Sequence, residues 1–351
     1  MSSQRIVILC PQPRGHDGIF DHAQNLTSEL RARGDHAVLA LARIWRGTAD
    51  GCSAPVAPHI RAQRMFSGPA LARPDVLVVQ FYAYGWARHG VTVRLLWILL
   101  TVRLRGRTRV LLFVHEPPAP RNGSFRRGVA AALQALQLRL LCRLSDRVAT
   151  TASERYVDAV RRRSGHRAVG GLRLPSSFAF VERERHDPLL IGYFETMHDS
   201  RPDWFDACRA TELPVKVDWV HLGGPPGADR DGVLRRRDIP EAEMSEWLAR
   251  ISVLLLPLRR GVSSRRTVLS AGLQAGCAVL STHGVDTDED LRDSHALVLV
   301  PDGDRDRFVQ ELAALVADPG RRESVGQEAM RLYSAEFGWD PIIELVRTIG
   351  T

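Results

Sequence analysis

Short apolar runs alternate with amphipathic stretches from the beginning of the chain. Residues 5–10 (RIVILC) and 36–42 (HAVLALA) are continuous apolar runs, the pattern of buried strands. Between them, residues 19–30 place apolar side chains at helical spacing, and Gly34 follows where a helix C-cap belongs. The pattern predicts a strand–helix–strand unit whose first loop contains glycine and lies at the carboxyl end of the strand, where parallel sheets bind ligands.

The same alternation continues through both halves of the chain. In the first half, we expect strands at 75–82, 109–116 and 147–153 and helices at 91–104 and 125–144. In the second half, the series runs through 189–195, 217–224, 233–240, 244–252, 253–282 and 295–319. A polar stretch ending in Pro188 separates the halves and is interpreted as a linker. Alternating strands and helices predict a parallel sheet, covered on both faces, in each half.

Composition fits an ordinary globular protein and narrows the functional classes. At 351 residues, the chain exceeds what one hydrophobic core usually supports, so two domains are expected. The five cysteines are scattered without a Cys-x-x-Cys pair, which indicates neither a disulfide framework nor a zinc site and favours a reducing compartment. The first apolar run is too short for a signal peptide, so a cytoplasmic location is expected.

The net charge of +8 is carried almost entirely by arginine, because Lys216 is the only lysine. Arginine binds phosphate with two hydrogen bonds, although an arginine-rich composition also arises in GC-rich genomes. No zinc-finger spacing, aromatic–basic alternation or basic heptad helix accompanies the charge, so no nucleic-acid partner is expected. An anionic small ligand or an acidic membrane surface explains the charge better.

The most informative segment is 253–282, where a cationic loop with glycine and serine joins an apolar run to a helical stretch. The loop amides and the helix N-terminus would point at one spot, as expected of a diphosphate site. The arginines close to that spot are Arg259, Arg260, Arg265 and Arg266. Two plainer interpretations remain: Arg265 and Arg266 lie on a solvated helix face, and Ser263 or Ser264 is an ordinary N-cap.

Residues 91–104 form a strongly apolar run that contains Arg94 and Arg103. The run is shorter than the roughly 20 residues that a membrane span needs. We therefore expect a buried crossover helix here. The alternative is a peripheral contact with the inner face of a membrane.

The order of these segments resembles that of retaining glycosyltransferases of the GT-B fold, specifically family 4. Residues 16–42 (HDGIFDHAQNLTSELRARGDHAVLALA) are similar to the family's opening loop, helix and strand. QFYAYGWARHG followed by LLFVHEPPAP is similar to a subgroup with a Q-Y-x-x-Y-G segment and an F-H-E strand end. In the second half, LQAGCAVLSTHG, LVLVPDGDRDRFVQEL and FGWDPIIELVRTI resemble later family segments in the same order.

The resemblance implies an α/β fold of GT-B type, with two Rossmann-like, doubly wound parallel-sheet domains and an interdomain cleft. An acceptor-binding domain would span 1–180, and a nucleotide-sugar-binding domain would span 181–335. Residues 336–351 would form a helix that crosses back to the first domain.

The resemblance also implies roles for individual residues. His115, with Glu116 beside it, would contact the transferred sugar or assist the acceptor hydroxyl; a buried structural histidine is the plainer interpretation. The implied acceptor-side residues are Gly15, Asp21, His22 and Tyr84. The implied donor and diphosphate residues are Gly18, Thr196, Arg201, Ser263, Ser264, Arg265, Arg266 and Thr267.

The chain departs from the family pattern at the donor site. The family's two glutamates fall on Ser263 and Ala271, and its arginine and lysine after the first strand of the second half fall on Thr196 and Arg201. A positive charge is therefore kept only at the second of these two places.

Several acidic strings imitate a metal-binding Asp-x-Asp motif. They are Asp229/Asp231, Asp286/Asp288/Asp290 and Asp302/Asp304/Asp306. Because they follow the expected strands and helices of the second half as loops, we expect solvated turns and no metal requirement.

These observations predict a metal-independent, retaining glycosyltransferase. It would move a hexose-type sugar from a nucleoside-diphosphate donor to an acceptor hydroxyl of an envelope glycan or natural product, with no cofactor besides the donor substrate. The alternative is a non-catalytic, GT-B-like nucleotide-binding partner protein, because the glutamate pair is replaced. A Rossmann oxidoreductase is disfavoured, since no G-x-G-x-x-G follows the first strand and no acidic residue closes the second.

Overall fold

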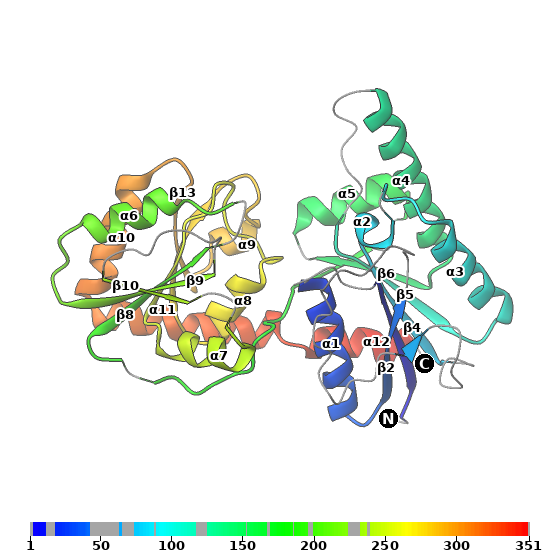
Figure 1. Ribbon diagram of the computed structural model, residues 1–351, viewed down its shortest axis with the longest axis horizontal. Coiled ribbons are helices and arrows are strands. Elements are labelled where there is room, and N and C mark those ends of the chain that lie inside the picture. Colours follow the sequence, from blue (N-terminus) through cyan, green and yellow to red (C-terminus); the bar gives the residue numbers. More distant parts are fainter. Residues whose placement is uncertain are drawn as a thin grey trace. The chain divides into compact units, whose positions relative to one another are not determined.

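The computed structural model describes most of the chain as two compact units. It describes residues 3–11, 18–42, 63–64, 74–87, 89–116, 125–151, 153–166, 169–184, 186–195, 199–223, 232–236 and 239–349. Unit 1 comprises Met1–Leu172 and Trp339–Thr351, and unit 2 comprises Arg173–Gly338 (Figure 1). The sequence analysis placed the domain boundary between residues 180 and 181, with the linker in the polar stretch that ends at Pro188.

Within the described residues, unit 1 contains a seven-stranded parallel sheet in the order β3-β2-β1-β4-β5-β6-β7. Its strands are β1 (Arg5–Pro11), β2 (His36–Ala42), β3 (Gln63–Arg64), β4 (Val76–Phe81), β5 (Arg109–Val114), β6 (Arg147–Thr151) and β7 (Val169–Leu172). Strand β4 is buried along its whole length, as a central parallel strand covered on both faces must be.

Helices cover both faces of the unit 1 sheet (Figure 1). They are α1 (Gly18–Ala32), α2 (Ala83–Trp86), α3 (Val93–Arg105), α4 (Phe125–Arg143), α5 (Glu154–Ser164) and α12 (Asp340–Ile349). The Thr92 hydroxyl caps the start of α3 by accepting from the amide of Leu95, and Gly106 ends that helix in the left-handed conformation. The C-terminal helix α12 packs on α1, β4 and β5, all within unit 1.

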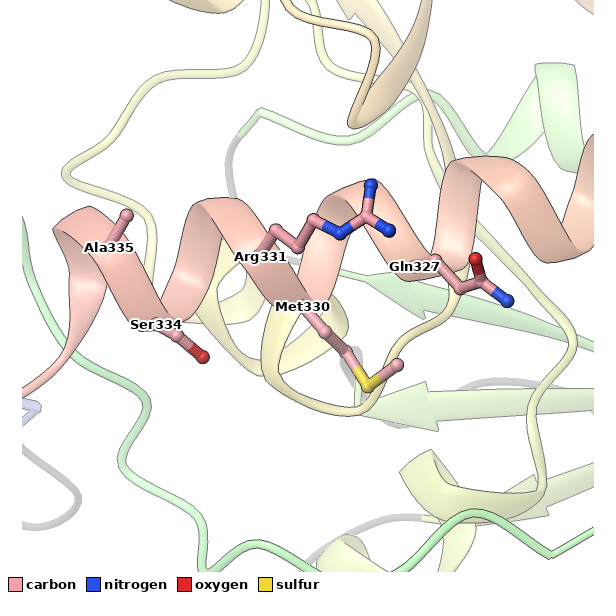
Figure 2. A pocket seen from close by; sticks show the side chains of 5 residues that line it. All are labelled: Gln327, Met330, Arg331, Ser334 and Ala335. Carbon is pink, nitrogen blue, oxygen red and sulfur yellow. The ribbon is translucent and has the colours of Figure 1, made fainter.

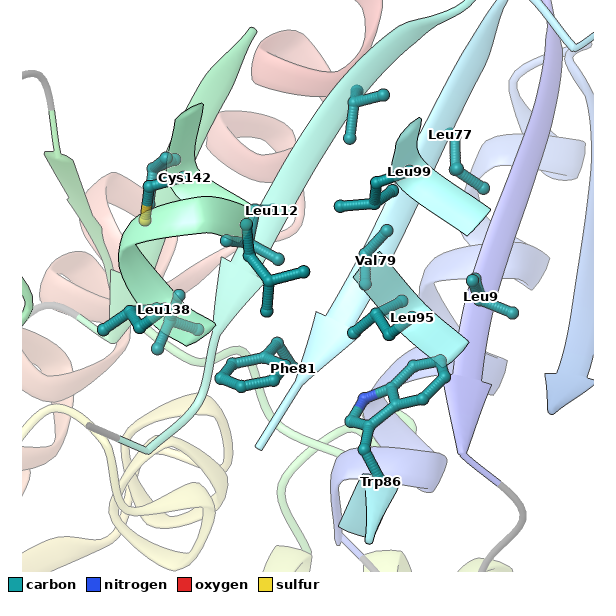
Figure 3. Close-up of a cluster of buried hydrophobic side chains, with 14 of the residues drawn as sticks. Leu9, Leu77, Val79, Phe81, Trp86, Leu95, Leu99, Leu112, Leu138 and Cys142 are labelled. Carbon is teal, nitrogen blue, oxygen red and sulfur yellow. The ribbon is translucent and has the colours of Figure 1, made fainter. Parts of the chain in front are cut away.

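One large hydrophobic core lies between α3, α4 and the sheet. Leu95 and Leu99 of α3 and Leu138 and Cys142 of α4 lie over Val79 and its neighbours on the sheet (Figure 3). Each of these side chains is fully buried. This face of the sheet therefore fixes the positions of both crossover helices.

Unit 2 contains a six-stranded parallel sheet within its described residues, in the order β10-β9-β8-β11-β12-β13. Its strands are β8 (Leu189–Glu195), β9 (Val217–Gly223), β10 (Val233–Arg236), β11 (Val253–Leu256), β12 (Ala278–His283) and β13 (Leu297–Pro301). Its helices are α6 (Pro202–Ala210), α7 (Glu241–Arg250), α8 (Thr267–Gln274), α9 (Glu289–Arg292), α10 (Arg305–Ala317) and α11 (Pro319–Leu332), followed by a π-helical turn at Tyr333–Phe337.

Each sheet has one place where the strand order reverses. In unit 1 the reversal lies between β1 and β4, and in unit 2 it lies between β8 and β11. Loops that leave two such neighbouring strands run in opposite directions, and the opening between them is where doubly wound sheets bind ligands. The prediction of two Rossmann-like parallel-sheet domains is confirmed, and these two edges define where to look for a site.

Candidate functional site

In unit 2, backbone hydrogen bonds join the loops that follow β8 and β11. The amide of Arg201 donates to the carbonyl of Pro257 (2.9 Å), and the amide of Arg259 donates to the carbonyl of Asp199 (2.8 Å). Ser200 and Leu258 form an antiparallel bridge between these two bonds. The two loops on either side of the strand-order reversal are therefore one connected structure.

The loop after β11 is also joined to the end of β12. The amide of Val262 donates to the carbonyl of Thr282 (2.8 Å). Gly261 has a φ of +85°, and a Cβ added there would collide with Thr287 Oγ1 and the backbone of Gly284. Only glycine allows this close approach without strain, so Gly261 fixes the position of the buried segment that follows it.

Ser263 and Ser264 are almost completely buried in that segment, each about 1% exposed. The amide of Ser264 donates to the Asp288 carboxylate (2.7 Å), so this amide is already engaged within the unit. The Ser264 hydroxyl is buried and makes no hydrogen bond to the described residues. Leaving a buried hydroxyl unpaired costs about 1 to 3 kcal/mol, so this hydroxyl is a candidate for contact with a bound ligand.

Two expectations about this region are wrong. Neither Ser263 nor Ser264 caps α8, because the N-cap position belongs to Arg266 and no side chain caps the helix there. Asp288 does not lie in a solvated turn: it is 7% exposed, because its carboxylate turns inward to accept from the loop. Asp286 is also mostly buried and binds Arg260 through two hydrogen bonds.

The arginines near this edge have different surroundings. Arg266 is half-buried and pairs with Asp199 of the loop after β8, so it does not lie on a solvated helix face. Arg265 is half-buried, whereas Arg259 and Arg260 are exposed. The Arg201 guanidinium lies 4.9 Å from the centre of the Trp204 ring, and its buried Nε has no hydrogen-bond partner among the described residues.

Two other positions complete the predicted donor side. Thr267 is half-buried and begins α8. Ala271 is buried in the hydrophobic core of unit 2, so its side chain packs against apolar neighbours. A carboxylate at this position would have to leave that core to reach a ligand.

In unit 1, the equivalent edge holds a buried pair formed by a histidine and a glutamine. His115, which follows β5, is 5% exposed, and its Nε2 lies 2.5 Å from Oε1 of the fully buried Gln80 at the end of β4. Its neighbour Glu116 is exposed. From the sequence, Gln80 was considered only as part of the segment QFYAYGWARHG. The signal that could have identified it is a side-chain amide inside an otherwise apolar strand.

His22 lies next to this pair, on the first turns of α1. Its ring centre is 5.3 Å from that of His115, 5.2 Å from that of Phe113 and 5.3 Å from that of Trp339. Burial lowers the pKa of His22 to about 4, an effect that the nearby Gln80 amide partly offsets. Neither ring nitrogen of His22, nor Nε2 of Gln80, has a hydrogen-bond partner among the described residues.

The remaining predicted residues of unit 1 are less enclosed. Tyr84 lies on α2 and is 52% exposed. Asp21 is half-buried near the start of α1, and Gly18 begins that helix with open space where a Cβ would lie. Gly15 and Thr196, as well as Asp229 and Asp231, lie outside the described residues. The structure thus brings His22 and His115 together, and it brings Arg201 and Arg266 onto the same joined loops.

Two surface hollows in unit 2 contain none of the predicted residues. One, of about 570 Å³, is lined by Gln327, Met330, Arg331, Ser334 and Ala335 on α11 and the turn after it (Figure 2). The other, of about 810 Å³, includes Leu189, Ser252 and Gly276, which lie at the amino ends of β8, β11 and β12. Both lie away from the carboxyl edge of the sheet, where the joined loops are.

In the described part of the chain, no group of three or more His, Cys, Asp or Glu side chains is arranged to hold a metal ion. No helix among the same residues combines the length and the apolar character that crossing a membrane requires.

These two Rossmann-like units define a class of fold, and solved structures share it over nearly the whole chain. A sucrose-phosphate synthase from Thermosynechococcus elongatus is 15% identical, covers 98% of this chain and 97% of its own, and has a TM-score of 0.61. The HepE protein of Anabaena, solved with UDP and glucose, is 12% identical with 98% coverage of both chains and a TM-score of 0.62.

An alpha-glucosyltransferase solved with UDP-glucose and DNA is 10% identical, covers 100% of both chains and has a TM-score of 0.66. The fold is therefore GT-B, as the resemblance of the segments implied. No protein-family model and no curated protein sequence matches this chain.

Proposed function

We propose that this protein is a glycosyltransferase that uses a nucleoside-diphosphate sugar. Unit 2 would bind the donor and unit 1 the acceptor hydroxyl compound. Two of the solved structures with the same fold contain UDP with glucose or UDP-glucose, which supports a donor of this class. The segments that resemble family 4 support the finer proposal of a retaining, metal-independent hexosyltransferase.

A single observation carries the proposal: two buried polar groups without partners in the described part of the chain lie on the loops at the reversal of strand order in unit 2. The Ser264 hydroxyl and Nε of Arg201 are buried without hydrogen-bond partners among the described residues. They lie on the loops after β11 and β8, which hydrogen bonds join into one structure. A diphosphate would supply acceptors to both groups, because its oxygens accept from hydroxyl and guanidinium donors alike.

The charges of this edge suit the departure of a nucleoside diphosphate. Breaking the bond between the sugar and the diphosphate leaves negative charge on the departing group, while the sugar becomes oxocarbenium-like. Arg201 and Arg265 would stabilise the departing charge, and the N-terminus of α8 would add its dipole. Arg266 is held by Asp199 and would orient the loop.

The histidine edge of unit 1 suits an acceptor hydroxyl. The carbonyl oxygen of Gln80 accepts from Nε2 of His115, which leaves Nδ1 as the basic nitrogen of the neutral ring. In a retaining transfer the acceptor reaches the sugar from the face that the diphosphate leaves, so His115 would hold the hydroxyl in place while an oxygen of the departing diphosphate takes up its proton. Gln80 would act as a positioning residue that fixes the tautomer of His115.

The test is nucleotide binding by the full-length protein, measured by calorimetry with UDP, GDP, ADP and dTDP. We expect one of them to bind selectively and Arg201→Ala to weaken that binding about 10- to 100-fold, because a charge-assisted hydrogen bond is lost. Ser264→Ala should weaken it about fivefold. Arg305→Ala, which changes an exposed arginine on α10, is the matched control and should have no effect.

Transfer assays with the matching nucleotide sugar then test the finer proposal. Activity should persist in EDTA, and the product should keep the anomeric configuration of the donor. The proposal is wrong if none of the four nucleotides binds, or if Arg201→Ala leaves the dissociation constant unchanged.

A further inference from the structure

Helices α3 and α4 of unit 1 each expose a continuous stripe of large apolar side chains. The exposed residues of α3 are Val93, Trp97, Leu100 and Leu104, and those of α4 are Val129, Leu133, Leu136 and Leu140. In both helices they follow one another at intervals of four, three and four residues, which places them on one helical face. Trp97 and Leu104 are 68% and 80% exposed. We call these eight residues the α3–α4 face.

Rotating α4 about its axis would not bury the exposed leucines without cost, because two glutamine side chains make hydrogen bonds on the inner side of the helix. Gln134 and Gln137 are almost fully buried. Gln134 donates to the carbonyl of His89 (3.2 Å), while Gln137 donates to the carbonyl of Gly90 (3.4 Å) and accepts from the amide of Thr92. The helix therefore has apolar side chains on both sides: Leu138 and Cys142 face the core beside the two amides, and four more are exposed, where a surface helix usually carries polar residues.

Both stripes point to the same side of unit 1. Leu95 and Leu99 of α3 share one core cluster with Leu138 and Cys142 of α4, and all four cover the same face of the sheet (Figure 3). The opposite sides of these two contacting helices consequently point away from that sheet face together. Exposed apolar residues that occur singly are ordinary, but a patch across two helices marks an interaction surface.

The charges that α3 and α4 themselves carry are all of one sign. Residues 93–109 and 125–143 contain no aspartate or glutamate. The exposed arginines on or beside the two helices are Arg94, Arg103, Arg105, Arg107, Arg139 and Arg143. Arg103 pairs with Asp146 just after α4, whereas neither helix contains an acidic residue that could pair with Arg105, Arg107 or Arg143. The surface is thus apolar along its centre and cationic at its ends.

We propose that the α3–α4 face docks on an anionic lipid bilayer, with both helices lying in the plane of the membrane surface. Apolar side chains on one helical face, with arginines around them, are the pattern of interfacial helices, and tryptophan prefers the level of the lipid headgroups. Arginines near an anionic leaflet add electrostatic attraction. The 13 residues of α3 are too few to span the bilayer, so the contact is shallow.

The charge pattern argues against two other occupants. A second copy bound through the same face would place one set of arginines against another, because a two-fold interface pairs the same patch with itself. A nucleic acid would contact the arginines but has no use for eight exposed apolar side chains. The proposal does not depend on sugar transfer and can be tested without any substrate.

The experiment is co-sedimentation of the full-length protein with vesicles of phosphatidylglycerol and phosphatidylcholine or of phosphatidylcholine alone. We expect preferential binding to the anionic vesicles. The double variant Trp97→Ser/Leu104→Ser should reduce the partition coefficient about tenfold or more, and Arg105→Gln/Arg107→Gln should reduce it only on anionic vesicles. Val215→Ser/Val285→Ser, which changes two exposed valines of unit 2, is the matched control and should leave binding unchanged.

All substituted side chains are exposed, so thermal unfolding should not change, and a circular dichroism melt verifies this. The proposal is overturned if the double variant Trp97→Ser/Leu104→Ser binds vesicles as well as the parent protein does. It is also overturned if the parent protein does not bind anionic vesicles. A dimer that the same double variant dissociates would point instead to a second copy. Binding that depends on the arginines alone and extends equally to DNA would point to a general polyanion surface.

Discussion

His22 shows how one buried side chain can make stability depend on pH. The ring lies against Phe113, His115 and Trp339 and is 5% exposed, so protonation would place a charge where water cannot reach it. The pKa of His22 accordingly falls from 6.5 in an unfolded chain to about 4. In the folded protein the ring is neutral across the physiological range.

Unit 1 should therefore lose stability as the pH falls from 6.5 towards 4, because His22 binds a proton in the unfolded chain but stays neutral in the folded chain. The contribution of His22 is complete above pH 6.5 and amounts to up to about 3 kcal/mol over this window. Urea unfolding at several pH values measures it, with amide exchange in β4 as the readout for unit 1. His22→Phe should flatten the pH dependence, and an unchanged slope in that variant would contradict the assignment.

For the candidate site, the sequence indicated where residues of suitable type occur, but it did not indicate their contacts. The sequence shows a histidine, His115, at the end of an apolar strand and two serines, Ser263 and Ser264, before a helix. All three are buried at the carboxyl edges of the sheets. The partner of the Ser264 amide is Asp288, 24 residues away, and the partner of Arg266 is Asp199, 67 residues away. Contacts of this separation depend on tertiary packing, which local spacing does not encode.

At the scale of elements, the joined loops of unit 2 depend on a glycine. Gly261 has a positive φ, and its position allows the loop after β11 to approach the end of β12. The segment from 261 to 264 that follows is completely buried. A change in this turn would displace both serines of the candidate site.

Gly261→Ala should destabilise unit 2 by about 3 kcal/mol or more, because the added methyl group is strained by the backbone and collides with Thr287 and Gly284. The matched control is Gly232→Ala, where φ is +70° but nothing lies within 4 Å of the new Cβ, so only about 1 kcal/mol is expected. Chemical unfolding compares the two. Equal losses would show that backbone strain alone acts at position 261.

Elements with a strong apolar pattern were predicted well, and those without it were missed. Strands β2 and β8 have the bounds that the sequence analysis gave, because each is a continuous apolar run between polar residues. Strand β7 was missed, since its sequence VGGL contains two glycines, and so was α5, where arginines dominate the second half of the helix. The alternative of a peripheral membrane contact for 91–104 remains a proposal, now joined by the stripe on α4.

At the scale of the whole molecule, the last helix completes the first unit. Ile342, Ile343 and Val346 of α12 are buried against unit 1. Arg347 of the same helix donates to the buried carboxylate of Asp35 (2.8 Å) and to the carbonyl of Arg33 (2.8 Å). Both the helix here and its attachment to the first half were implied only by the family resemblance.

Ile342→Ala should therefore destabilise unit 1 by about 2 to 5 kcal/mol, although the substitution lies nine residues from the end of the chain. Amide exchange should accelerate in β4 and β5, against which α12 packs, and should not change in β11 of unit 2. The exposed Glu344 on the same helix gives the control, since Glu344→Ala should stay within about 0.5 kcal/mol. Faster exchange in β11 as well would mean that the two units unfold as one.

The division of unit 1 between the two ends of the chain has a consequence for its synthesis. A ribosome makes Met1–Leu172 first, but the helix that covers β4 and β5 is translated only after the whole of Arg173–Gly338. Throughout that interval the nascent first sheet carries an uncovered apolar surface, which can bind chaperones and favours aggregation. The second sheet, encoded without interruption, can close as soon as it leaves the exit tunnel.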